Sequence, residues 1–164
     1  MMRLLEGFKV AAIVLAMLGL AACSSKNKPD VAAVDVENAV PGSQRDFTIN
    51  VGDRVLFLVD QSTLTPQAQE ILRRQATWLR QYAQVTIQVE GHADERGTRE
   101  YNIALSARRA EATKNFLIAQ GVSPGRVSTI AFGKERPLAI CSDESCFSQN
   151  RRAVTVITAG AVAG

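Results

Sequence analysis

The stretch GHADERGTREYNIALSARRA at residues 91–110 gathers acidic and basic side chains where the backbone pattern changes. The preceding residues VTIQVEG, 85–91, alternate apolar and polar side chains, as a half-buried strand does. The following residues place apolar side chains at helical spacing from about Arg99 to Gln120. Thr98 is suited to cap this helix, and Gly121 to end it. The charged loop is therefore predicted to lie between a strand and a helix.

Three further strands and one further helix are predicted around this centre. Short apolar runs indicate strands at residues 53–60, 127–133 and 151–158, and helical spacing after Thr65 and Pro66 indicates a helix that ends near Tyr82. Residues 134–150 are interpreted as a long polar excursion. Helices between strands require crossover connections. We therefore expect an α/β fold, or α+β sandwich: a four-stranded mixed parallel and antiparallel sheet with helices packed on it, formed by a βαβαβ core and a final strand.

The N-terminus has the pattern of a segment that directs export. Residues 1–22 combine Arg3 and Lys9 with an apolar run of signal-peptide length, although an uncleaved membrane anchor is the alternative. The sequence LAAC at residues 20–23 resembles the lipobox of bacterial lipoproteins, in which the cysteine carries the lipid. We thus expect a signal peptide at 1–22, a lipidated N-terminus and flexible tether at 23–45 beginning at Cys23, and one folded domain at 46–164.

Composition argues against nucleic-acid binding and gives little support to catalysis. The formal net charge is only +3, aromatic residues make up 5% of the chain, and no basic run is interleaved with them. His92 is the only histidine, and Ser106 has no evident base to activate it. Asp94 paired with Glu95 or Glu100 could serve a glycosidase, but adjacent positions point in different directions and the signal is weak. We expect no catalytic residue, no cofactor and no metal site.

Cys141 and Cys146 remain after Cys23 is assigned to the lipid. A disulfide between them is favoured for an exported chain in an oxidising compartment. Two free thiols and a zinc site are the alternatives, and the zinc site is the weaker because the neighbouring residues offer no usual tetrahedral set.

Asp94 and Arg109 are the candidate binding residues. Asp94 follows the strand and is expected at the edge of the sheet, facing solvent. Arg109 shares a helical stripe with apolar neighbours, so its guanidinium should be half-buried and need an anionic partner. Two arrangements fit this pattern: the two residues pair with each other, or they stand apart and hold the ammonium and the carboxylate of a zwitterionic ligand.

The motifs GHADERG and YNIALSARRA together resemble the OmpA-like peptidoglycan-binding family. Its patterns are G-H-T-D-x-x-G and N-x-x-L-S-x-x-R-A, and the similarity extends over about residues 53–158. The resemblance implies that Asp94 and Arg109 hold the diaminopimelate of the peptidoglycan stem peptide. It also implies pocket roles for Asn102, Leu105, Ser106 and Asp60, and supporting roles for Arg151 and Arg152.

Combined with the lipobox, this resemblance implies a non-enzymatic lipoprotein on the periplasmic face of the outer membrane. Its expected contacts are peptidoglycan, the membrane through its lipid anchor, and proteins of the Tol system, TolB first and TolA as a second candidate. The expected role is envelope integrity and cell division. Two rival interpretations stay open: a lipoprotein that hydrolyses peptidoglycan, and a structural lipoprotein without a ligand site.

Overall fold

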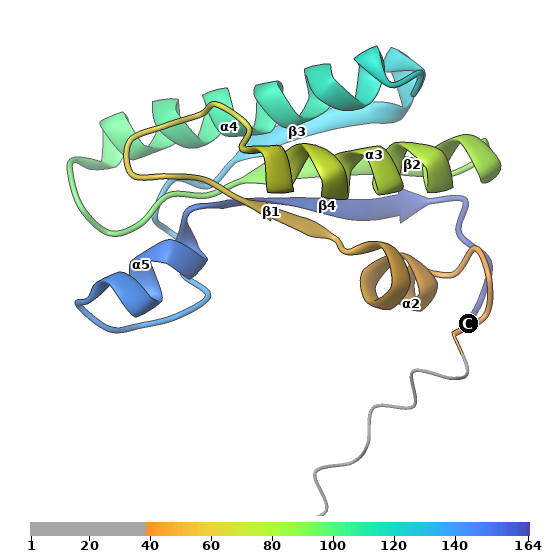
Figure 1. Ribbon diagram of the computed structural model, residues 1–164. Helices are drawn as coiled ribbons and strands as arrows, with labels where there is room; N and C mark the ends of the chain where they lie inside the picture. Colours follow the sequence, from red (N-terminus) through yellow and green to blue (C-terminus); the bar gives the residue numbers. More distant parts are fainter. Residues whose placement is uncertain (1–38) are drawn as a thin grey trace, which may run out of the picture. The chain divides into compact units, whose positions relative to one another are not determined.

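The computed structural model describes residues 39–164, and its centre is a four-stranded mixed sheet (Figure 1). The strands β1 (Arg54–Leu56), β2 (Thr86–Gly91), β3 (Val127–Ala131) and β4 (Arg152–Ala159) lie in the order β1-β4-β2-β3. Strands β2 and β3 are parallel, whereas β4 runs antiparallel to both β1 and β2. The mixed sheet predicted from the alternation of strands and helices is confirmed.

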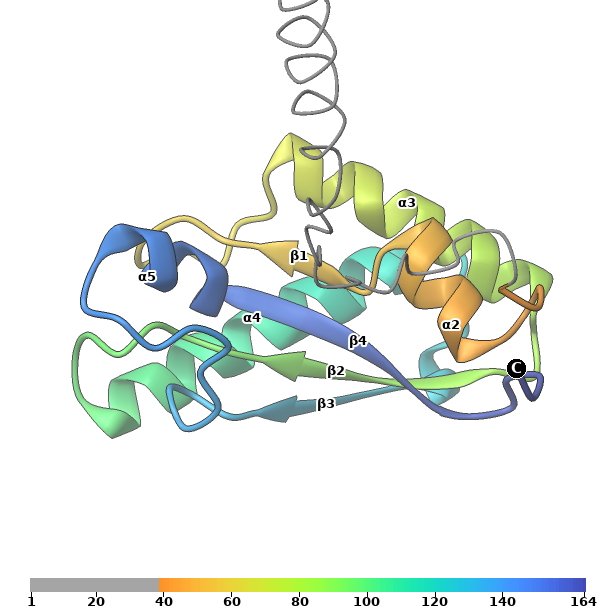
Figure 2. The same ribbon diagram turned by 90° about the horizontal axis from the view of Figure 1, so that it is seen from below.

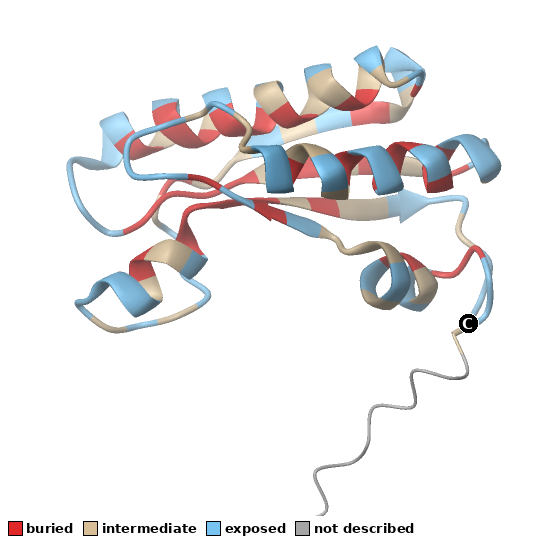
Figure 3. Cartoon of the chain, viewed as in Figure 1, coloured by how far each residue is buried: buried red, intermediate tan, exposed pale blue. Residues whose placement is uncertain are grey.

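Two long helices cover one face of the sheet and enclose the hydrophobic core (Figures 1 and 3). Helix α3 (Pro66–Gln81) begins at Thr65, whose hydroxyl accepts a hydrogen bond from the amide of Ala68. Helix α4 (Arg99–Ala119) begins at Thr98 in the same way. Both caps lie where the sequence predicted them. In each, the threonine oxygen accepts a hydrogen bond from an amide that the first turn of the helix leaves unpaired. The core between helices and sheet includes Leu72, Leu79, Val85, Ile87, Val89 and Leu117.

Two short helices lie on the opposite side of the sheet, near its two ends (Figure 2). Helix α2 (Gln44–Asp46) continues into a π-helical turn at Phe47–Val51, and α5 (Glu144–Asn150) precedes β4. Phe47 is buried against Trp78 of α3, and the Trp78 indole donates a 2.8 Å hydrogen bond to Asp46. Ser43, also buried, forms a parallel bridge with Val162. The folded region therefore extends into the last residues of the stretch predicted as tether.

Two elements differ from the sequence-based expectation. Strand β1 has three residues instead of the eight expected for 53–60, because the chain leaves the sheet after Leu56 and Asp60 adopts a left-handed conformation with φ 55°. Helix α5 falls within the segment predicted as a polar excursion. Its Phe147 and Asn150 are buried, and a single buried aromatic side chain is too little for a periodic signal.

The predicted signal peptide, the predicted lipidation site at Cys23 and residues 24–38 of the predicted tether lie outside the described residues. Within residues 39–164, none of the helices has the length and apolar character needed to span a membrane.

Candidate functional site

The loop between β2 and α4 holds the charged motif, and two glycines determine its path. A Cβ atom on Gly91 would lie 1.9 Å from the carbonyl oxygen of Ser106, so only glycine lets the end of β2 approach α4 this closely. Gly97 has a φ of 89°, a conformation that other residues rarely adopt. The Asn102 amide donates a 2.8 Å hydrogen bond to the carbonyl of Arg96. This contact fixes the loop to the first turns of the helix.

Arg109 is completely buried, more deeply than its place in the sequence suggests. Its Nη1 donates to the carbonyl of His92 at 2.8 Å, its Nε to Gln61 at 2.9 Å and its Nη2 to Leu58 at 3.1 Å. The guanidinium thus joins the loop after β1 to the end of β2. Among the described residues Arg109 forms no salt bridge, and carbonyl oxygens from two loops hold its guanidinium instead. Burial lowers the pKa of Arg109 to about 10, a shift that the charge of Asp94 partly opposes.

Asp94 is also buried, with 7% of its surface exposed, where the sequence predicted a solvent-facing carboxylate. Arg96, in the same loop, forms a salt bridge with Asp94 at 2.5 Å. Arg151, the residue that precedes β4, forms a second one at 3.2 Å. Burial opposes ionisation of the carboxyl group, but hydrogen bonds from Arg96 and Arg151 outweigh it and lower the pKa of Asp94 below its usual value. Asp94 is therefore ionised at neutral pH.

Asp94 and Arg109 do not pair with each other. Across the described part of the chain, the salt bridges of Asp94 go to Arg96 and Arg151, and the hydrogen bonds of Arg109 go to carbonyl oxygens. The two side chains line the same pocket instead. The direct ion pair, one of the two arrangements that the sequence left open, is thus not formed among the described residues.

The pocket has a volume of about 300 Å³. Five of the six residues predicted to bind the ligand or form its pocket line it: Asp60, Asp94, Asn102, Leu105 and Arg109. Ser106, the sixth, does not. Sequence reasoning missed the other lining residues, which are Val59, Arg96, Gly97, Tyr101 and Arg151.

The sequence signal differs among these residues. Arg96 and Gly97 stand in the quoted motif itself, next to Asp94, so their proximity was a usable signal. Tyr101, whose hydroxyl donates a hydrogen bond to Asp60, lies one turn into α4. Arg151 was assigned a supporting role, but it contacts Asp94 directly.

Ser106 and Arg152 act outside the pocket. The hydroxyl of Ser106 accepts a 2.9 Å hydrogen bond from the amide of Gly133, and Arg152 donates to the carbonyl of Arg136 at 3.2 Å. Lys134 follows Gly133 and donates to the carbonyls of Glu95 and Gly97 at 3.0 and 2.9 Å. The contacts of Lys134 hold the loop after β3 against the loop that carries Asp94, and the contacts of Ser106 and Arg152 hold it against α4 and β4.

His92, the residue after β2, is buried and does not line the pocket. Neither ring nitrogen has a hydrogen-bond partner among the described residues, and the ring packs on Phe132 at 5.5 Å between centroids. Burial, followed by the charges of Arg152 and Arg136, lowers the pKa of His92 to about 4. The imidazole therefore carries no charge at neutral pH.

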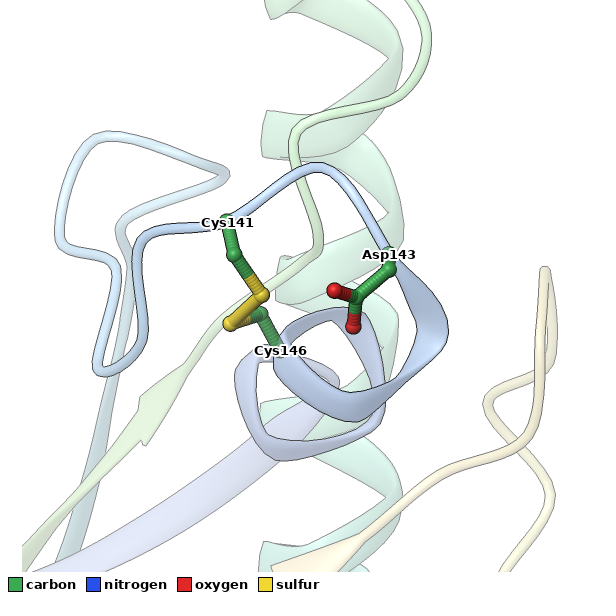
Figure 4. A group of neighbouring side chains, drawn as sticks. All are labelled: Cys141, Asp143 and Cys146. Carbon is green, nitrogen blue, oxygen red and sulfur yellow. A yellow bond between two sulfur atoms is a disulfide. The ribbon is translucent and has the colours of Figure 1, made fainter.

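Cys141 and Cys146 are joined by a disulfide, with 5.7 Å between their Cα atoms (Figure 4). Asp143 lies beside them, and the three residues would have the composition of a metal-binding group if the sulfurs were thiolates. The bonded sulfurs are not thiolates, which are the form that binds metal. The Asp143 carboxylate caps α5 by accepting a 2.8 Å hydrogen bond from the amide of Ser145. The group is a closed turn at the start of a helix.

The class of protein follows from this fold and from comparison with known families. The family model described as "OmpA family" matches residues 56–151, which include the last residue of β1, all of α3, β2, α4, β3 and α5, and the pocket. The chain belongs to the OmpA family.

Its relatives include named lipoproteins that it matches over most of their length. It is 56% identical to the peptidoglycan-associated lipoprotein of Mesorhizobium japonicum over 88% of both chains. It is 39% identical to the peptidoglycan-associated lipoprotein of Pseudomonas aeruginosa over 92% of this chain and 97% of the relative. These relatives are named as lipoproteins and not as enzymes.

Solved structures share the fold. The crystal structure of the peptidoglycan-associated lipoprotein from Burkholderia pseudomallei superimposes with a TM-score of 0.63 at 39% identity, covering 65% of this chain and 90% of the other. The C-terminal domain of Helicobacter pylori MotB has a TM-score of 0.61 at 22% identity, covering 65% of this chain and 84% of the other, and shows the fold alone.

Proposed function

We propose that this protein binds peptidoglycan non-covalently, by holding the diaminopimelate side chain of the stem peptide in the pocket between Asp94 and Arg109. The observation that carries the proposal is the separation of these two groups. Each is buried, charged and held by other partners, and both line one pocket. Their positions suit a ligand that presents a cation to one and an anion to the other.

The distal centre of diaminopimelate has this chemistry, because it carries an ammonium and a carboxylate on one carbon. Asp94 is the ammonium acceptor. Arg109 has five N–H groups, and carbonyl oxygens take three hydrogen bonds from them. The remaining donors are assigned to the ligand carboxylate. Asn102 and Leu105 border the same space, and Asp60 lies on its rim with Tyr101.

The wider role follows from this binding and from the relatives. We propose that Cys23 is lipidated and anchors the protein on the periplasmic face of the outer membrane, so that the domain links this membrane to the cell wall. A single acyl chain binds membranes only marginally, and several chains make release slow. Many copies of the protein on one membrane would together attach it strongly to the cell wall, even if each copy binds peptidoglycan with modest affinity. Partnership with TolB and TolA in envelope integrity and cell division is part of the same proposal.

The test is co-sedimentation of the lipid-free protein with purified peptidoglycan. Asp94→Asn removes the charge with little change of shape, and it should abolish sedimentation. Glu70→Gln is the matched control, since Glu70 forms an exposed ion pair with Arg73 on α3 and does not line the pocket. Both variants should first unfold in urea with a single transition, which shows that each is folded.

Two results would contradict the proposal. Sedimentation of folded Asp94→Asn at the wild-type level would place binding elsewhere. Release of soluble muropeptide fragments by the wild-type protein would favour the hydrolase interpretation.

A further inference from the structure

The charged residues that line the pocket do not balance each other. Arg96, Arg109 and Arg151 contribute three positive charges, and Asp60 and Asp94 contribute two negative charges. The lining alone thus has an excess of one positive charge. Such a pocket would suit an anion better than a zwitterion, because a net charge attracts the opposite sign at any orientation of the ligand.

Glu144 supplies the missing negative charge from outside the lining. It is the first residue of α5, and Arg151 donates hydrogen bonds to both of its carboxylate oxygens, one from Nη2 and one from Nη1 at 3.4 Å. The same carboxylate lies 3.9 Å from Arg96. Glu144 therefore contacts the two arginines that also hold Asp94. The hydrogen bond from Arg151 lowers the pKa of Glu144, which keeps it ionised.

Glu144 lies within the closed turn at the start of α5. The disulfide between Cys141 and Cys146 spans this turn, and Asp143 caps the helix just before Glu144 (Figure 4). One turn further on, the ring of Phe147 lies under the guanidinium of Arg96 at 4.6 Å. Helix α5 thus meets the pocket arginines through a carboxylate and an aromatic face.

We propose that Glu144, held in place by the Cys141–Cys146 disulfide, is a specificity-determining residue that makes the pocket electrically neutral and so lets it accept more than one charge form of the ligand. This inference rests on the proposed function. It goes beyond it by assigning a role to α5 and to the disulfide, neither of which lines the pocket.

The consequence is a defined preference between two ligands. A diaminopimelate centre with a free carboxylate is neutral, whereas the same centre with an amidated carboxyl is a cation. Without Glu144 the pocket would be positive, and it would repel the cationic form while affecting the neutral form little. Glu144 therefore governs the ratio of the two affinities more than either affinity alone.

The experiment measures dissociation constants by calorimetry for two soluble tripeptides of L-alanine, D-glutamate and meso-diaminopimelate. One has a free distal carboxyl group, and the other has it amidated. In Glu144→Gln, the preference for the free form over the amidated form should increase by about two- to fivefold, the range that an exposed charge pair supports. Affinity for the free form should change less than the ratio.

Glu135→Gln is the matched control. Glu135 is an exposed glutamate that pairs with Arg99 at 3.1 Å, and neither residue lines the pocket. This variant removes the same charge and should leave the ratio as in the wild type. An unchanged ratio in Glu144→Gln, or an equal change in both variants, would overturn the proposal.

The role of the disulfide is tested in the same assay. The double variant Cys141→Ser/Cys146→Ser should shift the ratio in the same direction as Glu144→Gln. Adding Glu144→Gln to the double variant should then produce no shift beyond that of Glu144→Gln alone. A wild-type ratio in the double variant, or a further shift in the combined variant, would show that the disulfide does not act through Glu144.

Failure of this inference and failure of the proposed function give different results. If the wild-type protein binds neither tripeptide, the proposed function is wrong, and the specificity role is wrong with it. If the wild type binds both and Glu144→Gln leaves their ratio unmoved, only the role of Glu144 is overturned.

Discussion

Replacing Arg109 by methionine should destabilise the fold, because its guanidinium serves as the shared donor for two loops. Three hydrogen bonds from a charged group are worth about 1.5 kcal/mol each at the lower end of their usual range. The methionine variant no longer buries a charge, which offsets part of this loss. Water that enters the pocket can also donate hydrogen bonds to some of the carbonyls. We expect the free energy of unfolding to fall by about 3 kcal/mol in Arg109→Met.

Equilibrium unfolding in urea, monitored by circular dichroism, measures this change. With the slope usual for a small protein, the midpoint should move by about 1–2 M urea. Arg108→Met is the control, since Arg108 is the adjacent residue of α4 and is exposed, and it should stay within about 0.5 kcal/mol of the wild type. If Arg109→Met were as stable as Arg108→Met, the carbonyls of Leu58, Gln61 and His92 would not depend on the guanidinium, and the structural part of our reasoning would be refuted.

Three further predictions concern the surroundings of the pocket. Burial lowers the pKa of His92 in the folded protein to about 4 from an ordinary 6.5, so the stabilisation of the fold by the neutral imidazole is complete above pH 6.5 and is lost as the pH falls toward 4. The single histidine Hε1 resonance should report this pKa in an NMR titration, and a pKa near 6.5 would contradict the prediction. Gly91→Ala should cost about 3 kcal/mol in urea unfolding, because its Cβ would meet the Ser106 carbonyl, and a wild-type midpoint would refute the close approach. Lys134→Met should speed amide hydrogen exchange at Gly97 and its neighbours, whereas unchanged exchange would show that Lys134 does not hold this loop.

The sequence predicted most of the fold because its elements have strong local signals. The alternation of residues 85–91 and the threonine caps at Thr65 and Thr98 act over a few residues, and each was found where it was expected. Helix α5 has no such signal, since it is short, polar and packed through Phe147. Strand β1 is short because the chain turns after it to bring the carbonyls of Leu58 and Gln61 to Arg109. This contact is with a residue far away in the sequence, so the local pattern does not show it.

The site was predicted in its residues but not in its contacts. Asp94 and Arg109 were identified from motif and charge, yet apart from Arg96, which contacts Asp94 within the same motif, their partners come from distant parts of the chain. Arg151, which holds Asp94, is 57 residues away, and the carbonyls that hold Arg109 lie 17 to 51 residues away. Backbone carbonyls are present at every position, so the sequence gives no sign of which ones a buried guanidinium will use.

The most direct test of the central claim is an NMR titration of the lipid-free protein with the free-carboxyl diaminopimelate tripeptide, following the Arg109 Nε and Asn102 side-chain amide signals. We predict saturable shifts of both signals in the wild type and none in Asp94→Asn. Binding of the tripeptide with shifts confined to residues outside the pocket, or equal shifts in folded Asp94→Asn, would contradict the claim that these two charges form the ligand clamp.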